Sequence, residues 1–398
     1  MKNSRIALAA ALASLTAGAA LAQSGNSVEL YGVADAYVGS KSVYQYSGFD
    51  PVAQQFVATK NSQAVVDSGG LSESRLGIRV KEDLGNGLNA FAVFEQAVSL
   101  DAGTTGAAAR KSVVGLSSDW GSVSLGRQAS SYHDLHTSYD VQADGQFSAI
   151  AGLPLNAAAM TQVAAFRVCQ TEALCMGNPG VLANTLAVIN GNGYAARTGA
   201  FVGYQKRFNN SLRYDTPNFN GFTGSVSVGV GENKTGVSKA GLNTAFSLNY
   251  ANGPLSLGIA HQQDQEQAPA VIVLPGSGTP VGITPAGGIV KLNNTLLAGS
   301  YDFGVLRLNM GFNVAKYNMT GVRNQKETFI GATIPMGALT LVGQYAHSQG
   351  NSLNKATSFA GEAQYALSKR STVYAAYNHS KLPAYKNNLV GFGLRHAF

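Results

Sequence analysis

Apolar and polar residues alternate one by one in many short segments of this chain. In segments 76–80, 222–230, 242–250 and 306–314, every second position is Leu, Ile, Val, Phe, Tyr or Met, apart from Gly224 and Thr244, with Arg, Asn, Ser, Thr or Gly common between them. Because side chains of a strand alternate between two faces, each segment predicts a strand with one apolar face. So many strands with a small, polar or cationic second face indicate a lipid-facing exterior around a wet interior.

The connections between these segments alternate between short and long. Short ones carry turn residues and cover 82–87, 118–121, 216–221, 252–254, 301–304, 335–337 and 368–371. Long ones cover about 41–70, 131–197 and 265–290. This asymmetry predicts an all-β fold, a transmembrane antiparallel β-barrel with short periplasmic turns, long external loops and both termini periplasmic. The short turns give eight hairpin pairs, and therefore sixteen strands, if the first and last strands close the barrel.

Both ends of the chain fit export to a membrane. Lys2 and Arg5 precede an apolar run from residue 6 to 21 and the small-x-small pattern of residues 20–22, which predicts a signal peptide over 1–22. A transmembrane helix is less favoured, because the run is short and a polar sequence follows it. The mature chain, 23–398, is then one barrel domain, and its last strand ends on the aromatic Phe398.

Composition and cysteine usage narrow the classes further. The chain has 12% charged residues, 47 Gly, 17 Tyr and 17 Phe, which is unusual for a cytosolic enzyme, and it lacks the Lys/Arg runs of nucleic-acid-binding arms. Cys169 and Cys175 are the only cysteines. An even count, close together in an exported chain, predicts one disulfide, with a free pair as the alternative.

Catalytic motifs are missing from the sequence. It contains no Gly-x-Ser-x-Gly elbow, Walker loop or HExxH pattern, and the pair His133 and His136 has no third ligand beside it. We therefore expect no enzyme activity, no cofactor and no metal. Two alternatives stay open: an outer-membrane barrel hydrolase, which a hydrolysis assay would reveal, and a plugged structural or adhesive barrel, which would conduct little current.

Six motifs together resemble a known family. They are Val28-Glu29-Leu30-Tyr31-Gly32-Val33-Ala34-Asp35, Ser74-Arg75-Leu76-Gly77, Glu82-Asp83-Leu84-Gly85-Asn86-Gly87-Leu88, Leu125-Gly126-Arg127-Gln128, Arg207-Phe208-Asn209-Asn210-Ser211 and Gly393-Leu394-Arg395-His396-Ala397-Phe398. This set is similar to the general diffusion porins of Gram-negative bacteria, of the beta-proteobacterial type. The resemblance extends over the whole mature chain.

The resemblance implies a homotrimer of sixteen-stranded barrels in the bacterial outer membrane. Each barrel would hold a water-filled channel for passive diffusion of ions and small hydrophilic solutes. Its third external loop, here 131–197, would fold into the lumen, and the composition of residues 155–174 predicts a short helix in it. Implied partners are outer-membrane lipid, lipopolysaccharide and the barrel-assembly machinery, which would recognise the C-terminal strand through Phe398; nucleic acid is not expected.

The resemblance also implies a constriction in which wall arginines face loop carboxylates. Arg75 and Arg127 match two of the family's wall arginines, and Arg207 is a third candidate. The nearest loop carboxylates are Asp134, Asp140 and Asp144. Simple alternation puts Arg127 on the same face as Leu125, so it needs a bulge or a strand end to point inward. Family members often carry a lysine where this chain has Val33. The alternative for each of these charged residues is a solvated position without a special role.

Charge predicts the selectivity of such a channel. Without Lys2 and Arg5 the chain has 26 basic and 21 acidic residues, a net charge of +5. Strict alternation places cations in the lumen at Arg75, Arg79, Lys81, Arg207, Arg213 and Arg307, against wall carboxylates at Asp35 and Glu95. Positive fixed charge enriches anions in a narrow aqueous passage, so we expect a weak anion preference that fades as salt rises.

Overall fold

The computed structural model describes residues 25–50, 55–150, 200–201, 204–232, 240–267, 272–273, 280–281, 289–319, 322–350, 355–381 and 386–398. The expected signal peptide, the expected helix in 155–174 and the Cys169–Cys175 pair lie outside these residues. Within them the chain is nearly all β, with the helix α2 (Ser131–Tyr139). In this described part, no helix combines the length and apolar character needed to cross a membrane.

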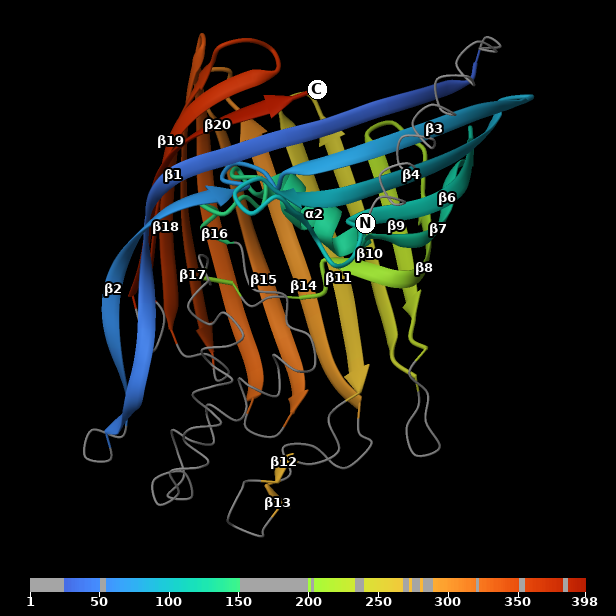
Figure 1. The fold of residues 1–398 in the computed structure, drawn as a ribbon. Coiled ribbons are helices and arrows are strands. Elements are labelled where there is room, and N and C mark those ends of the chain that lie inside the picture. Colours follow the sequence, from blue (N-terminus) through green and yellow to red (C-terminus); the bar gives the residue numbers. More distant parts are fainter. Residues whose placement is uncertain are drawn as a thin grey trace, which may run out of the picture.

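One closed antiparallel sheet forms the body of the molecule (Figure 1). Its strands are β1 (Ser27–Asp50), β2 (Gln55–Ser68), β3 (Arg75–Gly85), β4 (Leu88–Ser99), β6 (Lys111–Ser118), β7 (Gly121–Ala129), β8 (Arg207–Asp215), β9 (Phe222–Val230), β10 (Leu242–Asn252), β11 (Leu255–Gln267), β14 (Ile289–Asp302), β15 (Arg307–Met319), β16 (Val322–Met336), β17 (Leu339–Gly350), β18 (Ala356–Ala366), β19 (Ser371–Lys381) and β20 (Lys386–Ala397). Three two-residue strands are β5 (Thr104–Thr105), β12 (Ile272–Val273) and β13 (Pro280–Val281).

The barrel has sixteen strand positions because β2 and β3 share one of them. β2 pairs with residues 36–50 of β1, and β3 then pairs with residues 27–33. β20 pairs with residues 33–41 of β1 and closes the sheet. The closed sixteen-stranded barrel predicted from the turns is confirmed. Closure leaves no free sheet edge at the seam between the first and last strands, as a structure surrounded by lipid requires.

The seven short turns all lie where they were predicted. In the turn from β3 to β4, for example, Asn86 and Gly87 adopt positive φ angles of 53° and 75°, which a two-residue hairpin turn of this kind needs. The segment 41–70, predicted as a long loop, differs: β1 continues to Asp50 and β2 begins at Gln55. Valine, tyrosine and phenylalanine, which favour strands, are frequent in this segment and extend the β1–β2 hairpin through it.

A short break between β2 and β3 is organised by one carboxylate. Asp35 on β1 accepts hydrogen bonds from the backbone N–H groups of Gly70 at 3.1 Å, Leu71 at 2.9 Å and Ser72 at 2.9 Å. The Tyr374 hydroxyl donates a further bond at 2.6 Å. Asp35 was predicted as a wall carboxylate of the lumen, but it is fully buried and its oxygens are used by these donors. The Asp35 carboxylate therefore stabilises the backbone of the break between β2 and β3.

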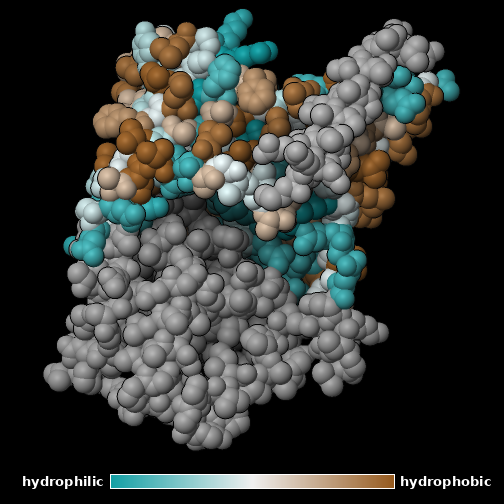
Figure 2. Space-filling model, viewed as in Figure 1, coloured by the Kyte–Doolittle hydropathy of each residue, from teal (hydrophilic) through white to brown (hydrophobic). Residues whose placement is uncertain are grey.

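The outward faces of the strands are apolar. Exposed residues at every second position include Leu297 (60% exposed), Met310 (55%) and Phe392 (64%), and Figure 2 shows hydrophobic residues gathered on the outer surface near the C-terminal end of the barrel. A water-soluble protein seldom exposes so much contiguous apolar surface. The alternation therefore places a lipid-facing wall outside, as the sequence predicted.

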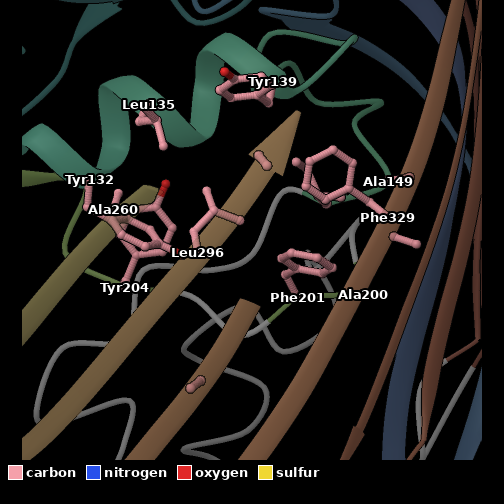
Figure 3. Packing of buried hydrophobic residues seen from close by; sticks show 14 of the residues in the cluster. Tyr132, Leu135, Tyr139, Ala149, Ala200, Phe201, Tyr204, Ala260, Leu296 and Phe329 are labelled. Carbon is pink, nitrogen blue, oxygen red and sulfur yellow. The ribbon is translucent and has the colours of Figure 1, made fainter. Parts of the chain in front are cut away.

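A second apolar cluster lies inside the barrel. Tyr132, Leu135 and Tyr139 of α2 pack with Ala260 and Leu296 on inward faces of the strands (Figure 3). Nearby, the ring of Phe201 contacts that of Phe329 edge-on, with 6.0 Å between the ring centroids. Small and apolar residues on the inner face of β14 to β18 are thus covered by the chain segment that enters the lumen. This packing holds α2 against one side of the barrel.

Candidate pore constriction

The helix α2 begins directly after β7. Ser130 is its N-cap, and its hydroxyl accepts a hydrogen bond from the His133 backbone N–H at 3.1 Å. Asp134 lies in the first turn, where a carboxylate interacts favourably with the helix dipole. The serine cap followed by an early carboxylate is the sequence signal that could have predicted this helix at 131–139.

Polar contacts fix α2 to the wall formed by β9 to β15. The Ser131 hydroxyl lies 2.8 Å from that of Ser225. The Tyr132 hydroxyl donates to the Asn313 side-chain oxygen at 3.0 Å, and in the same way Tyr139 reaches Asn249 at 2.6 Å. Hydroxyl and amide groups on the inner strand faces therefore help to position the helix, in addition to the apolar cluster.

The residues after α2 reach the opposite wall. The Gln142 side-chain amide donates to Glu362 on β18 at 2.9 Å. Asn378 on β19 donates to the Phe147 carbonyl at 3.0 Å, and the Gln146 backbone N–H donates to the Gly70 carbonyl at 3.0 Å. The segment 130–148 thus crosses the lumen from β9–β15 to β1 and β18–β19. Segment 130–148 is therefore anchored to both walls of the barrel.

Four charged residues from β3, β4 and nearby loops meet in one cluster. Arg75 Nε lies 3.5 Å from Glu95, and Arg110 Nε lies 2.7 Å from the same carboxylate. Arg110 also forms an ion pair with Glu73. Arg207 extends the cluster from β8, with its Nη2 3.5 Å from Glu73. Two of the predicted wall arginines, Arg75 and Arg207, are therefore brought into a single network.

Arg127 lies opposite a bulge in β8. Gly126 and Gln128 of β7 pair with Ser211 and Phe208, so the extra residue belongs to β8. The Arg127 side chain donates to the Ala109 carbonyl at 2.5 Å and to the side-chain oxygen of Asn209. Among the residues that the structure describes, no carboxylate forms an ion pair with Arg127. It neighbours Arg207, whose positive charge acts on it.

The three loop carboxylates take different places. Asp134 forms an ion pair with Arg213 on β8, which also contacts Asp215 at 2.7 Å. Asp144 lies 2.6 Å from Lys206 Nζ. Asp140 instead accepts hydrogen bonds inside the loop, from the Gln142 and Asp144 backbone N–H groups at 2.9 Å and from the Ser148 hydroxyl at 2.7 Å. Asp134 and Asp144 thus lie beside wall cations, and Asp140 holds the turn after the helix.

Five charged members of the site were missed by sequence reasoning: Glu73, Arg110, Lys111, Lys206 and Asp215, the last at the end of β8. Glu73 lies before β3, Arg110 and Lys111 lie at the start of β6, and Lys206 precedes β8. Each is at or next to a strand end, where alternation no longer predicts direction. These residues are close to Arg75 and Arg207 only across neighbouring strands. Predicting that proximity requires the strand register, which the sequence does not show.

Two histidines of α2 are held neutral. Burial lowers the pKa of His136 to about 4, and burial also lowers the pKa of His133 well below its usual value. His133 Nδ1 lies 2.9 Å from the Tyr204 hydroxyl. In the described part of the molecule neither ring nitrogen of His136 has a hydrogen-bond partner, and the rings of Tyr132 and Tyr204 surround it. No group of three or more His, Cys, Asp or Glu among the described residues could hold a metal ion.

The charged groups and the apolar cluster occupy different sides of the lumen. Glu73, Asp134 and Asp215 have side chains that are 53%, 49% and 36% exposed, and all three contact cations of the β3–β8 side. The inner faces of β14 to β18, by contrast, carry buried apolar residues such as Leu296 on β14 and Phe329 on β16. The exposed carboxylates and their cationic partners therefore lie together on the β3–β8 side of the lumen.

Comparison with known proteins decides the family. The model of the Gram-negative porin family matches residues 7–384. The chain belongs to the Gram-negative porins. Outer membrane porin protein 32 of Delftia acidovorans is 31% identical to this porin over 391 residues, which cover 94% of this chain and 88% of the relative. An outer membrane porin protein of Bordetella pertussis is 26% identical over 98% of this chain and 99% of its own length.

Solved structures show the same fold. An anion-selective porin from Comamonas acidovorans superimposes with a TM-score of 0.67 at 24% identity, covering 94% of this porin and all of that chain. OmpT of Vibrio cholerae, an outer membrane protein, gives a TM-score of 0.58 at 13% identity, covering 95% of this porin and 99% of that chain. Membership of the Gram-negative porin family and relatives named outer membrane porins show that the protein resides in the bacterial outer membrane, where it forms a water-filled channel for passive diffusion of ions and small hydrophilic solutes. The recognition from sequence motifs is confirmed.

Proposed function

We propose that this porin is a weakly anion-preferring diffusion channel that is not gated at neutral pH. Its constriction would lie between α2 and the β3–β8 wall. The groups assigned to it are seven cations, Arg75, Arg110, Lys111, Arg127, Lys206, Arg207 and Arg213, and five carboxylates, Glu73, Glu95, Asp134, Asp144 and Asp215. Seven positive and five negative charges leave a net charge of +2.

The proposal rests on the surroundings of Arg127. This residue combines a position next to Arg207 with the lack of an ion-pair partner in the described residues. A cation that is not neutralised by the protein attracts mobile anions. The sequence of residues 151–199 adds Arg167, Arg197 and Glu172, which does not reverse the sign. A structural relative described as anion-selective fits the same sign.

Reversal potentials in a KCl gradient across a planar bilayer test this selectivity. We expect chloride to permeate somewhat better than potassium at about 0.1 M salt, and this preference to shrink towards about 1 M, because the Debye length falls from about 10 Å to about 3 Å. A cation preference at low salt would show that Asp134 and Asp144 dominate the passage, and would overturn the proposal.

The alternatives are less favoured. A barrel hydrolase needs a histidine that reaches substrate, but His133 and His136 are buried against tyrosines, and Asp144, the nearest carboxylate to His133, is bound to Lys206. A lipid or peptide hydrolysis assay should therefore give no turnover. A plugged barrel would pass almost no current, so single-channel recording separates it from the open passage proposed beside β3–β8.

The assembly of the porin is also proposed. We expect a homotrimer that contacts outer-membrane lipid and lipopolysaccharide, and delivery by the barrel-assembly machinery through the C-terminal strand. The support is the family and the position of Phe398, which follows β20 on the outward face with its side chain half-exposed. Crosslinking followed by mass measurement in detergent would test the oligomer; a monodisperse monomer would contradict it.

A further inference from the structure

Two glycines of the inner wall lie directly behind the segment that crosses the lumen. Gly258 is on β11 and Gly331 is on β16, and both are buried on the inward face of their strands. A glycine inside a strand often marks a place where another part of the chain approaches closely. Both belong to the described residues, and neither has a positive φ angle. Backbone conformation therefore does not require glycine at either position, and the reason lies in the neighbouring side chains.

The space in front of Gly258 is filled by α2. A Cβ atom at this position would lie 2.8 Å from the Tyr139 ring and 3.0 Å from a methyl carbon of Leu135. Leu135 points from α2 towards the inner wall (Figure 3). Because non-bonded carbon atoms prefer a separation of about 3.5–4.0 Å, these contacts leave no room for a side chain on Gly258. The helix thus rests on the bare backbone of β11.

Neither the Tyr139 ring nor the strand below it can easily move aside. The Tyr139 hydroxyl donates to the Asn249 side-chain oxygen at 2.6 Å and lies 2.8 Å from the Ser256 hydroxyl, so rotation of the ring would break these contacts. β11 is paired with β10 on one side and β14 on the other, which fixes its backbone. An added Cβ atom on Gly258 is therefore accommodated by lifting α2 away from β11.

Gly331 forms a second contact of the same kind. A Cβ atom there would lie 2.7 Å and 3.0 Å from the two methyl carbons of Val141, the second residue after α2. The next nearest atom, Cγ of Gln344, would be at 3.5 Å, which is an ordinary contact. Val141 therefore decides whether a side chain fits at Gly331. We call Gly258 and Gly331 the seat glycines, because the crossing segment rests on them.

The seat glycines fix how far the crossing segment projects into the lumen. Both face inward, so a shift that relieves the contacts moves the segment away from β11 and β16. On the same helix, Asp134 is joined to Arg213 of the β3–β8 wall. A segment that moves away from the seats therefore moves towards that wall.

We propose that Gly258 and Gly331 are positioning residues that set the width of the passage. Without Cβ atoms they let α2 and Val141 lie about 1 Å deeper against the inner wall, the difference between the contacts at these positions and ordinary carbon–carbon separations. The inference rests on the proposed function, in which the constriction lies between α2 and the β3–β8 wall.

Single-channel conductance and the exclusion of neutral polyethylene glycols of graded size test this role. Gly258→Ala and Gly331→Ala should each lower the conductance by roughly a fifth and exclude polymers that still enter the wild-type channel, because permeation depends on pore diameter. Gly343→Ala is the matched control. Gly343 is also inside a strand, β17, but no atom of the described residues lies within 4 Å of the position of its Cβ. Its conductance and size limit should equal those of the wild type.

An exchange of volume separates positioning from a general loss of packing. Val141→Ala removes the two methyl carbons that meet the new Cβ atom, so Gly331→Ala/Val141→Ala should recover the conductance and size limit of the wild type. Heat-resistant oligomers on unheated gels identify the variants that assemble. If Gly258→Ala does not assemble, the Gly331 series decides alone.

Three results would overturn the proposal: an unchanged conductance and size limit in the assembled single variants, an equal loss in Gly343→Ala, or no recovery in Gly331→Ala/Val141→Ala. Reversal potentials are recorded on the same samples. A cation preference of the wild type at low salt would contradict the proposed selectivity and leave the result on the seat glycines standing.

Discussion

Lys206 Nζ lies 2.6 Å from Oδ2 of Asp144, although residues 151–199 separate them in the sequence. The ion pair joins the segment that follows α2 to the segment that leads into β8. Burial is the largest single influence on the pKa of Asp144 and raises it, but the charge and hydrogen bond of Lys206, together with smaller contributions from His133 and His136, hold that pKa below its ordinary value. The pair thus fastens the entering and leaving ends of the long loop to each other beside the constriction.

Asp144→Asn should loosen this junction. The substitution leaves the Lys206 ammonium without its anionic partner, and we expect a loss of about 1–3 kcal/mol in the local stability of the docked loop. Limited proteolysis of the folded oligomer, followed by mass spectrometry, would locate faster cleavage between residues 140 and 206. Lys206→Gln should cost at least as much, because Asp144 is the more buried partner and its carboxylate would lose the charge that offsets its burial. Identical proteolysis rates in wild type and Asp144→Asn would contradict the junction.

Acid should loosen the same loop through His136. Its folded pKa of about 4 is below the unfolded value of about 6.5, so the unfolded or undocked state binds the proton more readily. The stabilising contribution is complete above about pH 6.5, decreases as the pH falls towards about 4, and amounts to at most about 3 kcal/mol.

The His136→Phe variant isolates this effect. Phenylalanine fills a similar volume among Tyr132 and Tyr204 and cannot be protonated. Burial raises the pKa of Asp140, so this carboxyl contributes in the opposite direction at the lower end of the range, in both proteins alike. Burial also lowers the pKa of His133, which therefore acts in the same direction as His136 and is retained in the variant. Proteolysis of the loop should accelerate between about pH 6.5 and about 4 in the wild type and less in the variant; parallel pH profiles would rule out His136 as a cause.

Deletion of Phe398 should reduce assembly. Its backbone closes the barrel seam, with Phe398 N–H donating to the Gly32 carbonyl at 3.1 Å and Gly32 N–H donating to the Phe398 carbonyl at 3.0 Å. We expect fewer heat-resistant oligomers on unheated gels, while Phe398→Tyr, which keeps an aromatic ring at the membrane surface, should assemble normally. Unchanged oligomer yield after the deletion would show that the terminal residue is dispensable.

The Cys169–Cys175 disulfide stays a prediction. Intact-mass analysis after alkylation of the native protein should find no modified thiol, because the oxidising periplasm favours the bridge. In the chain-entropy description, so short a ring changes global stability by at most about 2–3 kcal/mol. Two alkylated cysteines would contradict it.

The strands and turns of the barrel could be predicted because they depend on residues that are close together in the sequence. Alternation fixes which side chains face lipid, and glycine and asparagine mark turns such as Asn86–Gly87, so strand number and orientation follow from nearby residues. The charge network depends instead on register and on the path of the long loop. Arg110 and Lys206 meet their partners across 15 and 62 residues of chain, and no local pattern predicts such pairs.

Asp35 and Arg127 are two residues whose surroundings the alternation of side chains did not predict. Alternation placed Asp35 in the lumen, but three backbone N–H groups of the break after β2 enclose its carboxylate. Alternation gave Arg127 the outward face unless a bulge intervened, but the bulge beside it has its extra residue in β8. Contacts with Ala109 and Asn209, which no alternation rule predicts, place Arg127 beside Arg207.

Arg127 should therefore contribute more to anion preference than Arg75. Arg75 is partly neutralised by Glu95 at 3.5 Å, whereas Arg127 is held by the neutral groups of Ala109 and Asn209. Arg127→Gln should lower the chloride-to-potassium permeability ratio about twofold at about 0.1 M salt, the effect of removing one charge a few ångströms from the ion path. Arg75→Gln, the matched control, should lower it less, since Arg110 still faces Glu95 at 2.7 Å. Reversal potentials of both variants, recorded in the same KCl gradient, decide between them; a larger loss in Arg75→Gln would return the source of selectivity to the wall position predicted from the sequence.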